Sequence, residues 1–470
     1  MRGTRFLLAA LVAGGVCAFG DLVDTLSPPP DHPAIKYHDE TQRPLQDAVS
    51  KLNQRIAESA VRLRFEPGSG YLRSLLETLD VPVESQLAVF SKSSLQAPLI
   101  GPENPRTIFF SDTVAVAWMR GGFIELASQD PEKGVIFHVL EQRPGEIPHF
   151  IRRDDCTRCH ISDASLGVPG MMLRSLFTAP DGSPRLILGA YTTDHRSPFE
   201  ERWGGWYVSG ELSRIRHMGN TVYPDEYHAK TIAVHLGDGY LARSSDIAAL
   251  LVFDHQMHMT NLLVRIGWET RAGLHDDRDD LDAWLRSAAR EFVDYLLFVD
   301  EAPLPRKIRG TSGFAERFAA FGPKDSQGRS LRELALDKRL MRYPCSYMIY
   351  TDAFDDLPAP ARDAIYERMW QVLSGTDPDP KYTRLSFGDR KAVVEILRET
   401  KKGLPLFFGR SDNRRFGFDN YSDGLCHLNG VSIRLEWRPP CDAAGGSHGW
   451  SPQIRAHSEP SAPSLLRLAA

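Results

Sequence analysis

The 470-residue sequence predicts an α+β fold with a β-rich N-terminal part, a middle segment built around a cysteine and histidine motif, and a mainly helical C-terminal part. Two observations predict this fold. Residues 84–150 contain short runs rich in Val, Ile and Phe, separated by Pro, Gly, Asp and Asn, which is typical of strands. From Ser245 onward, apolar residues recur at the three- and four-residue intervals of helices.

The first twenty residues have the layout of a secretory signal peptide. Arg2 and Arg5 precede an apolar run from Phe6 to Phe19, which ends in the small-residue sequence AFG. The run is shorter than the roughly 20 residues of a membrane-spanning helix. We therefore expect residues 1–20 to be cleaved and the protein to be periplasmic or otherwise exported, with no integral membrane segment in the mature chain.

The N-terminal part begins with a Pro-rich stretch over residues 21–44, which we expect to be a loose leader. The β-rich region follows over residues 45–150, and its first element is an amphipathic helix from Leu45 to Leu63. Its five strand-like runs are LAVFSK, RTIFF, VAVAWM, FIELA and VIFHVLE. The middle segment, residues 151–235, adds two extended runs, PRLILGAYTT and GGWYVSG.

A helical region is expected over residues 236–410. Its helical segments are SDIAALLVFDHQMHMTNLLVRIGWE, LDAWLRSAAREFVDYLLFV, PARDAIYERMWQVLSG and SFGDRKAVVEILRETKKG. In the last of these, Ser386 and Asp389 have the spacing of a helix-starting box, and two lysines and a glycine mark the end. The C-terminal segment, residues 411–470, has a tail rich in Gly, Ser, Pro and Ala that we expect to be disordered.

The net charge and the number of cysteines restrict the classes of function that the chain can have. A formal net charge of −5 with interspersed signs provides no basic patch for nucleic acid. Cleavage after residue 20 leaves the cysteines at 156, 159, 345, 426 and 441. Thiols usually pair in an oxidising compartment. If the first two are engaged elsewhere, counting alone predicts a Cys426–Cys441 disulfide and a buried thiol at Cys345.

The stretch RRDDCTRCHISD is the main indication of a cofactor, because it contains C-x-x-C-H, the attachment sequence of a c-type haem. On one helical turn these positions share a face, so Cys156 and Cys159 can reach two vinyl groups while His160 points at the iron. A zinc site needs a second ligand pair, and no such pair follows in the sequence. A thioredoxin-like redox pair and a plain thiol pair are the competing interpretations. We expect one covalent haem c, held by the segment 151–235.

The motif leaves the second axial position of the iron open. Histidine or methionine there makes an electron carrier, whereas an open position allows peroxide chemistry. We favour His217, followed by Met218, because both lie beside a Gly-Asn turn that holds a loop in shape. The remaining candidates, each of which could instead serve core packing, are Met171, Met172, His195, His255, His258 and Met259.

The run HRSPFEERWGGWYVSG brings aromatic side chains and a Gly-Gly pair together. It is either a wall of the haem pocket or an ordinary aromatic cluster beneath a tight turn. Arginine suits carboxylates, so the candidate partners of the haem propionates are Arg152, Arg153, Arg196 and Arg202. Asp154 and Asp155 are expected to start the helical turn of the motif.

Longer strings carry a resemblance: SQLAVFSKSSLQ, NPRTIFFSDTVAVAWMRGGFIELASQDPEKGVIFHVLEQ, CTRCH with GVPGMMLRS, TDHRSPFEERWGGWYVSG, HMGN, GTSGFAERFAAFGPKDSQGRSLRELAL and YPCSYMIYTDAF. From about Ser85 to Leu404 the chain resembles a family of exported bacterial monohaem proteins characterised only by a cytochrome c motif. The resemblance implies haem binding and electron transfer, with no established substrate. It matches Cys156, Cys159 and His160 to the family's haem motif. His217 falls in its H-x-G-N string, with Met218 where relatives have leucine.

We therefore expect electron transfer through a single haem c, with iron ligands His160 and His217 and an unidentified redox partner protein. The alternative is a haem-dependent oxidoreductase or peroxidase-like enzyme with an open distal site, where His195 and Arg196 would serve peroxide chemistry. A haem-based sensor or interaction module is a third interpretation.

Overall fold

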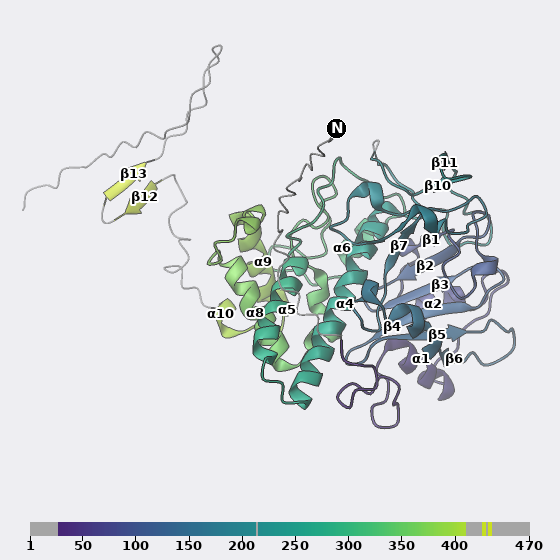
Figure 1. The fold of residues 1–470 in the computed structure, drawn as a ribbon, viewed down its shortest axis with the longest axis horizontal. Coiled ribbons are helices and arrows are strands. Elements are labelled where there is room, and N and C mark those ends of the chain that lie inside the picture. Colours follow the sequence, from purple (N-terminus) through teal and green to yellow (C-terminus); the bar gives the residue numbers. More distant parts are fainter. Residues whose placement is uncertain (1–26, 213–214, 410–424, 429–430, 435–470) are drawn as a thin grey trace, which may run out of the picture.

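The computed structural model describes residues 27–212, 215–409, 425–428 and 431–434. An antiparallel sheet lies on one side and a group of helices on the other, with the long helix α4 beside the sheet (Figure 1). The expected α+β fold is confirmed, with strands in the N-terminal half and helices in the C-terminal half.

Seven strands form one sheet in the order β6-β5-β4-β3-β2-β1-β9. They are β1 (Leu87–Val89), β2 (Arg106–Phe110), β3 (Val114–Trp118), β4 (Ile124–Asp130), β5 (Gly134–Leu140), β6 (Phe150–Arg152) and β9 (Trp206–Tyr207). The five strand-like runs of the N-terminal part are thus confirmed. The run GGWYVSG supplies β9, which pairs with β1, so the middle segment completes the sheet of the N-terminal region.

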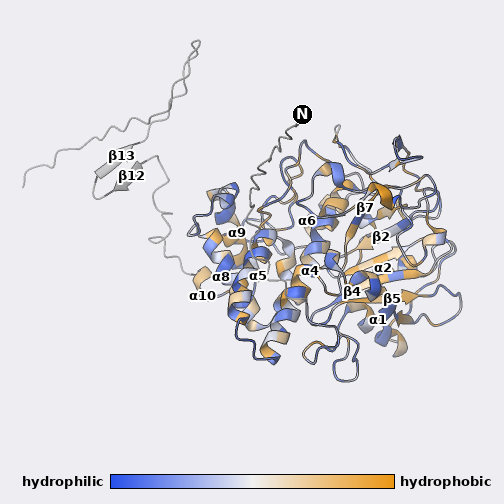
Figure 2. Cartoon of the chain, in the orientation of Figure 1, coloured by the Kyte–Doolittle hydropathy of each residue, from blue (hydrophilic) through white to orange (hydrophobic). Residues whose placement is uncertain are grey.

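The alternation of side chains along the strands gives the sheet two different faces. On β3, Val114, Val116 and Trp118 pack with α1 (Ala48–Ala57) and α2 (Leu72–Thr78). Ala115 and Ala117 point to the opposite face, which carries the core cluster shared with α4. Figure 2 shows the apolar colour on strands of this sheet.

Helix α1 is shorter than the sequence pattern indicated over Leu45–Leu63. The side chain of Asp47 accepts hydrogen bonds from the amides of Val49 and Ser50 and so fixes the start. The helix ends at Ala57, and Ser59 adopts a left-handed φ of 58°, which a continuing helix does not allow.

Helix α4 (Ile247–His275) is 29 residues long and buried along most of its length. Asp246 caps its start by accepting hydrogen bonds from the amides of Ala248 and Ala249. It packs against α5 (Leu281–Leu296) and α8 (Ala359–Leu373). Because it is surrounded by protein, its polar side chains reach into the interior, where they position the segments described below.

The remaining elements are shorter, and one of them confirms a predicted cap. In α9 (Phe387–Thr400), Ser386 and Asp389 form the expected reciprocal capping box. The other helices are α3 (Thr157–His160), α6 (Phe314–Ala320), α7 (Asp352–Asp355) and α10 (Leu406–Gly409). The other strands pair as β7 (Leu173–Leu176) with β8 (Ala190–Thr193), β10 (Thr221–Val222) with β11 (Lys230–Thr231), and β12 (Leu425–Leu428) with β13 (Val431–Arg434).

Residues 27–44, here called the strap, correct the expectation of a loose leader. Ile35 and Tyr37 are each only 1% exposed and belong to a core cluster with Trp268 of α4. The hydroxyl of Tyr37 donates to the carbonyl of Val135 at 2.8 Å. The sequence pattern missed this packing because two apolar side chains among prolines and charged residues have no period.

Some of the expected features lie in segments that the structure describes only in part or not at all. The signal peptide and the tail beyond Pro439 lie outside the described residues, as do Cys441 and the side chain of Cys426. Cys345 is fully buried and unbonded, as expected. Among helices of the described residues, none has the length and apolar character needed to cross a bilayer.

Candidate functional site

The C-x-x-C-H motif lies just after the edge strand β6. A 3-10 turn over Asp154–Cys156 leads into the single helical turn α3, so the motif has the helical geometry that its spacing predicts. Cys156 is half-buried and packs on the core, Cys159 is exposed, and both are unbonded thiols. Burial raises the pKa of the Cys156 thiol to about 11. A catalytic redox cysteine has a lowered pKa, so this environment does not favour the thioredoxin-like interpretation.

His160 is held in one tautomer. Its Nδ1 lies 2.8 Å from the carbonyl oxygen of Gly170, which can only accept, so Nδ1 carries the proton. The ring packs against Phe137 of β5, with 4.6 Å between the ring centroids. Burial lowers the pKa of His160, which keeps the imidazole neutral. The lone pair of Nε2 is therefore available to a metal, as in histidines that ligate metals and donate their other N–H to a carbonyl.

Helix α4 fixes the loop that supplies this carbonyl. Asn261 accepts a hydrogen bond from the amide of Met171 at 3.0 Å and donates to the carbonyl of Met171 at 2.7 Å. A Cβ atom on Gly170 would stand 2.1 Å from Oδ1 of Asn261, so only glycine fits there. The amide of Gly170 also donates to the carbonyl of His160 at 3.0 Å. The orientation of His160 thus depends on a polar side chain of the buried helix.

The sheet face near His160 carries small side chains. Ala127 of β4 stands between Phe137 of β5 and Ala115 of β3 in the strand register. Ala115 and Ala117 are each 8% exposed, and Ala127 is only partly covered. Ala115 and Ala117 are covered by the core cluster, and Ala127 packs against it while staying partly accessible.

An ion pair lies near these alanines. Arg106 of β2 contacts Glu125 of β4 with a nitrogen to oxygen distance of 2.7 Å. In the register, Ala117 of β3 pairs with Glu125 and with Ile108, which lies two residues after Arg106 on β2. Both side chains are mostly buried, and the charges of both act on the pKa of His160. This face therefore offers apolar surface, a neutral imidazole and a paired charge at one place.

His217 lies in the loop before β10. Its ring packs edge-on against Trp203, with 5.7 Å between the centroids, and burial lowers its pKa. Within the part of the chain that the structure describes, its buried Nδ1 has no hydrogen-bond partner. A Cβ on Gly219, two residues on, would meet Val208, which shares the α4 side of the sheet with Trp206. The neighbours of His217, Trp203 and Val208, belong to the same core cluster as Phe137, although β9 and β5 lie toward opposite ends of the strand order.

The loop that carries His217 is held from several directions. Met218 donates its amide proton to the carbonyl of Arg202 at 3.0 Å. Asn220, with a left-handed φ of 58°, exchanges two hydrogen bonds of 2.8 Å with the backbone of Val208. Gly204 approaches the backbone of Leu176, where a Cβ would stand 2.6 Å from the carbonyl oxygen. The Gly-Gly pair thus permits close packing on β7.

Trp203 connects this loop to α4. The residue is fully buried with a left-handed φ of 66°, a strained conformation for a large side chain. Its indole N–H donates to the carboxylate of Asp254 at 3.0 Å, and Thr193 donates to the same carboxylate at 3.0 Å. Burial raises the pKa of Asp254 to about 6, although the nearby guanidinium of Arg202 opposes the shift.

The other candidate ligands are engaged in the interior. Met218 is buried, and its sulfur accepts a hydrogen bond from Ser175 at 3.5 Å. His195 and His255 are buried with their Nδ1 atoms 2.8 Å apart. His258 contacts Arg196, Met171 and Met259 are core residues, and Met172 is partly buried. The structure brings none of these to an open position beside Cys156.

The four arginines expected to bind propionates already have partners. Arg202 is 2% exposed and donates to the carbonyls of His195 and Ser197. Arg196 pairs with Asp194, Arg153 with Asp155, and Arg152 with Glu40 and Asp154. Asp154 and Asp155 lie in the first turn before the motif, but their side chains serve these ion pairs and not a helix cap.

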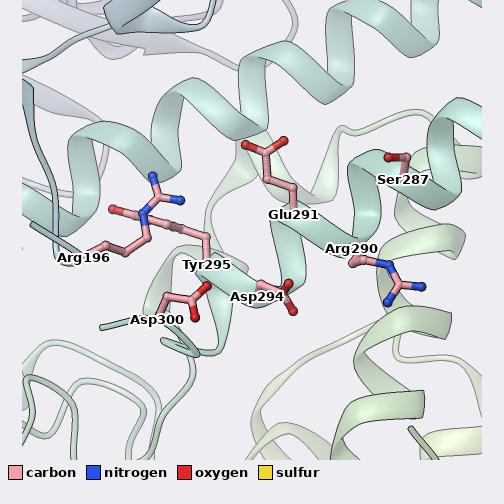
Figure 3. A pocket seen from close by; sticks show the side chains of 7 residues that line it. All are labelled: Arg196, Ser287, Arg290, Glu291, Asp294, Tyr295 and Asp300. Atoms are coloured by element: carbon pink, nitrogen blue, oxygen red, sulfur yellow. The ribbon is translucent and has the colours of Figure 1, made fainter. Parts of the chain in front are cut away.

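A surface pocket of about 290 Å³ lies beside α5, away from the motif. Its lining is shown in Figure 3 and consists of Arg196, Ser287, Arg290, Glu291, Asp294, Tyr295 and Asp300. The guanidinium of Arg196 lies 4.9 Å from the centre of the Tyr295 ring. Asp294 accepts hydrogen bonds from Lys381 and Tyr382. The pocket contains neither a candidate iron ligand nor a cysteine.

Sequence reasoning missed four residues that organise this region: Arg106, Glu125, Asp254 and Asn261. The signal that points to them is a polar residue inside a segment that is otherwise apolar, because such a residue must find a buried partner.

No family model matches this chain, and neither a curated protein nor a solved structure is similar to it at a significant level.

Proposed function

We propose that the chain is an exported c-type haem protein that transfers electrons through one haem, bonded to Cys156 and Cys159 and ligated by His160. One observation carries the proposal. The two free thiols and the imidazole share one helical turn, and the Gly170 carbonyl keeps the proton of His160 on Nδ1, so that the lone pair of Nε2 can ligate iron.

The surroundings fit a haem. Ala127, which is only partly covered, provides apolar surface beside Phe137, on which His160 packs, and the Arg106–Glu125 pair provides charges nearby. The buried Nδ1 of His217 has no hydrogen-bond partner among the described residues, so it could serve as a ligand atom. A bound c-type haem supplies an iron that gains and loses one electron.

The protein side chains divide the remaining tasks. His160 would ligate the iron, His217 is the proposed second ligand, and Trp203 with Asn220 keeps the His217 loop in place. Cys159 is exposed, so its thioether would form at the surface, where a redox partner protein has access.

The peroxidase-like alternative gains no support from its proposed residues. Peroxide chemistry needs an accessible histidine and arginine beside the iron. His195 is 2% exposed and stacks on Tyr295 at 4.0 Å, while Arg196 is held by Asp194. Electron transfer is therefore the function we retain.

A spectroscopic redox titration of the purified protein tests this function. We expect reversible one-electron reduction, low-spin spectra in both oxidation states and slow reaction with cyanide, because both axial positions are filled. A high-spin ferric spectrum with rapid cyanide binding would show an open iron position and contradict the carrier role.

A further inference from the structure

We infer that His32, His275 and Asp276 form a binding site for a divalent transition-metal ion of the zinc class, separate from the haem motif. The ligand atoms of these three side chains lie within 4.8 Å of one another. They come from the strap and from the C-terminal end of α4, which are 244 residues apart in the chain. The inference does not depend on the proposed electron transfer.

The geometry is close to what a metal ion requires. Nε2 of His32 lies 3.1 Å from one carboxylate oxygen of Asp276, and Nδ1 of His275 lies 2.7 Å from the other. Ligands bound tetrahedrally at 2.0–2.1 Å stand about 3.3 Å apart. Shifts of about an ångström in side chains therefore suffice to place an ion between the three groups.

The donor set selects the class of ion. Two imidazoles and one carboxylate suit zinc and its neighbours in the transition series, whereas magnesium and calcium prefer oxygen ligands alone. His275 and Asp276 are about half-exposed, so water can complete the coordination.

The position explains what the ion would do. The strap contacts β6 through Arg152, which donates to the carbonyl of Tyr37 at 2.9 Å, and it contacts the loop after the motif through Ser27, which donates to the carbonyl of Leu166 at 3.0 Å. A metal between His32 and the end of α4 fastens the strap to the core. Because the three ligands come together only in the folded chain, the free energy of metal binding stabilises the fold.

One existing contact must be given up. The amide of Ala34 donates to Nδ1 of His32 at 3.2 Å, whereas an imidazole that binds metal through Nε2 carries its proton on Nδ1. This competition limits the affinity, and we expect a dissociation constant on the order of micromolar.

Calorimetric titration of zinc chloride into protein freed of metal with a chelator tests the site. We expect one ion per chain and a zinc-dependent rise in melting temperature. Asp276→Asn and His275→Ala each should weaken binding by roughly tenfold or more, because each removes a ligand atom. Both positions are exposed enough for the variants to fold.

His38→Ala is the matched control. His38 also lies in the strap and pairs with an aspartate, Asp31, at 2.7 Å, but has no third ligand among the described residues. Zinc binding should be unchanged in His38→Ala and in Cys159→Ser. No binding by the wild type, or equal binding by the Asp276 and His275 variants, overturns the inference. Loss of binding only in Cys159→Ser would place the ion on the C-x-x-C-H motif, which overturns both this site and the haem proposal.

Discussion

At the scale of single residues, the chemistry of His160 depends on a glycine ten positions away. The carbonyl of Gly170 accepts a hydrogen bond from Nδ1, and the absence of a side chain at Gly170 lets Asn261 bond the backbone of Met171 and so hold this loop in place. A histidine of ordinary pKa with a free ring would exchange tautomers and would not be ready to ligate a metal.

Replacing Gly170 by alanine tests this packing. The new Cβ would clash with Oδ1 of Asn261, which must then give up its hydrogen bonds to Met171. We expect the free energy of unfolding to fall by about 1–3 kcal/mol in urea titrations. Gly237→Ala is the control, because no atom lies within 4 Å of a Cβ at that position. Equal stability of the two variants would show that the Asn261 contact is dispensable.

The proposed role of His217 as the second iron ligand is also tested by single substitutions. His217→Ala should convert the ferric haem spectrum from low-spin to high-spin and allow rapid cyanide binding, because it removes the proposed imidazole. Met218→Leu should leave the spectrum unchanged, since its sulfur already accepts from Ser175. His228→Ala, at an exposed position paired with Asp225, controls for histidine loss in general. A changed spectrum in Met218→Leu alone would assign the ligand to Met218.

At the scale of elements, α4 organises the candidate haem site although it carries neither of the two proposed iron ligands. Asn261 holds the loop after the motif and Asp254 holds Trp203, which packs on His217. The helix is buried on most sides, so each of these polar groups must be hydrogen-bonded, and each then determines the position of a neighbouring segment.

The carboxyl of Asp254 gives this arrangement a pH signature. Its pKa is raised by burial from 3.8 to about 6, so between these pH values the folded protein holds a proton that the unfolded chain releases. The contribution of this carboxyl to the free energy of unfolding is therefore greatest below pH 4. It falls as the pH rises through 6, by about 3 kcal/mol at most. In Asp254→Asn, which retains an acceptor for the indole, this loss should be absent.

Urea unfolding of wild type and Asp254→Asn at pH 4, 5, 6 and 7 measures the effect. Comparing the two proteins cancels the titration of all other groups. The stability of the wild type relative to the variant should decline across this range. A difference that is the same at every pH would mean that the folded-state pKa of Asp254 is close to its ordinary value.

The elements themselves were largely predictable from the sequence, whereas their assembly was not. Strands β2 to β5 and helices α4, α5, α8 and α9 follow from local periodicity and caps, which are properties of neighbouring residues. The pairing of β9 with β1, and the burial of Tyr37 beneath Arg152, depend on contacts between residues far apart in the chain.

The candidate site was also predictable from the sequence only in part. The spacing of Cys156, Cys159 and His160 predicts their shared helical turn, which the structure confirms. Which arginine is free for a carboxylate was not predictable, because Arg152 and Arg202 are engaged by residues distant in sequence or by backbone carbonyls. His217 stays a predicted ligand, supported by its burial and its orphaned nitrogen.

At the scale of the whole molecule, the strap is part of the fold. Tyr37 packs against Trp268 and donates to Val135, and Arg152 stacks on its ring at 4.8 Å. The N-terminal segment therefore joins the sheet edge beside the motif to the far end of α4.

Tyr37→Ala should lower the free energy of unfolding by about 3–5 kcal/mol, because it removes a buried aromatic side chain and leaves a cavity. Tyr227→Ala, at a side chain that is 87% exposed, should change stability by less than about 0.5 kcal/mol. Urea titration measures both. Two equal, small effects would mean that the strap does not contribute to stability and is the loose leader that the sequence pattern indicated.

We propose that porphyrin is attached covalently to Cys156 and Cys159. The most direct measurement is the intact mass of the chain, produced together with haem-attachment machinery and denatured before analysis, with Cys345→Ser as the control thiol variant. The account predicts a mass gain of one haem in the wild type and in Cys345→Ser, and none when Cys156 and Cys159 are both replaced by serine. A wild-type chain with no added mass, or with haem that solvent extracts from the denatured protein, would contradict it.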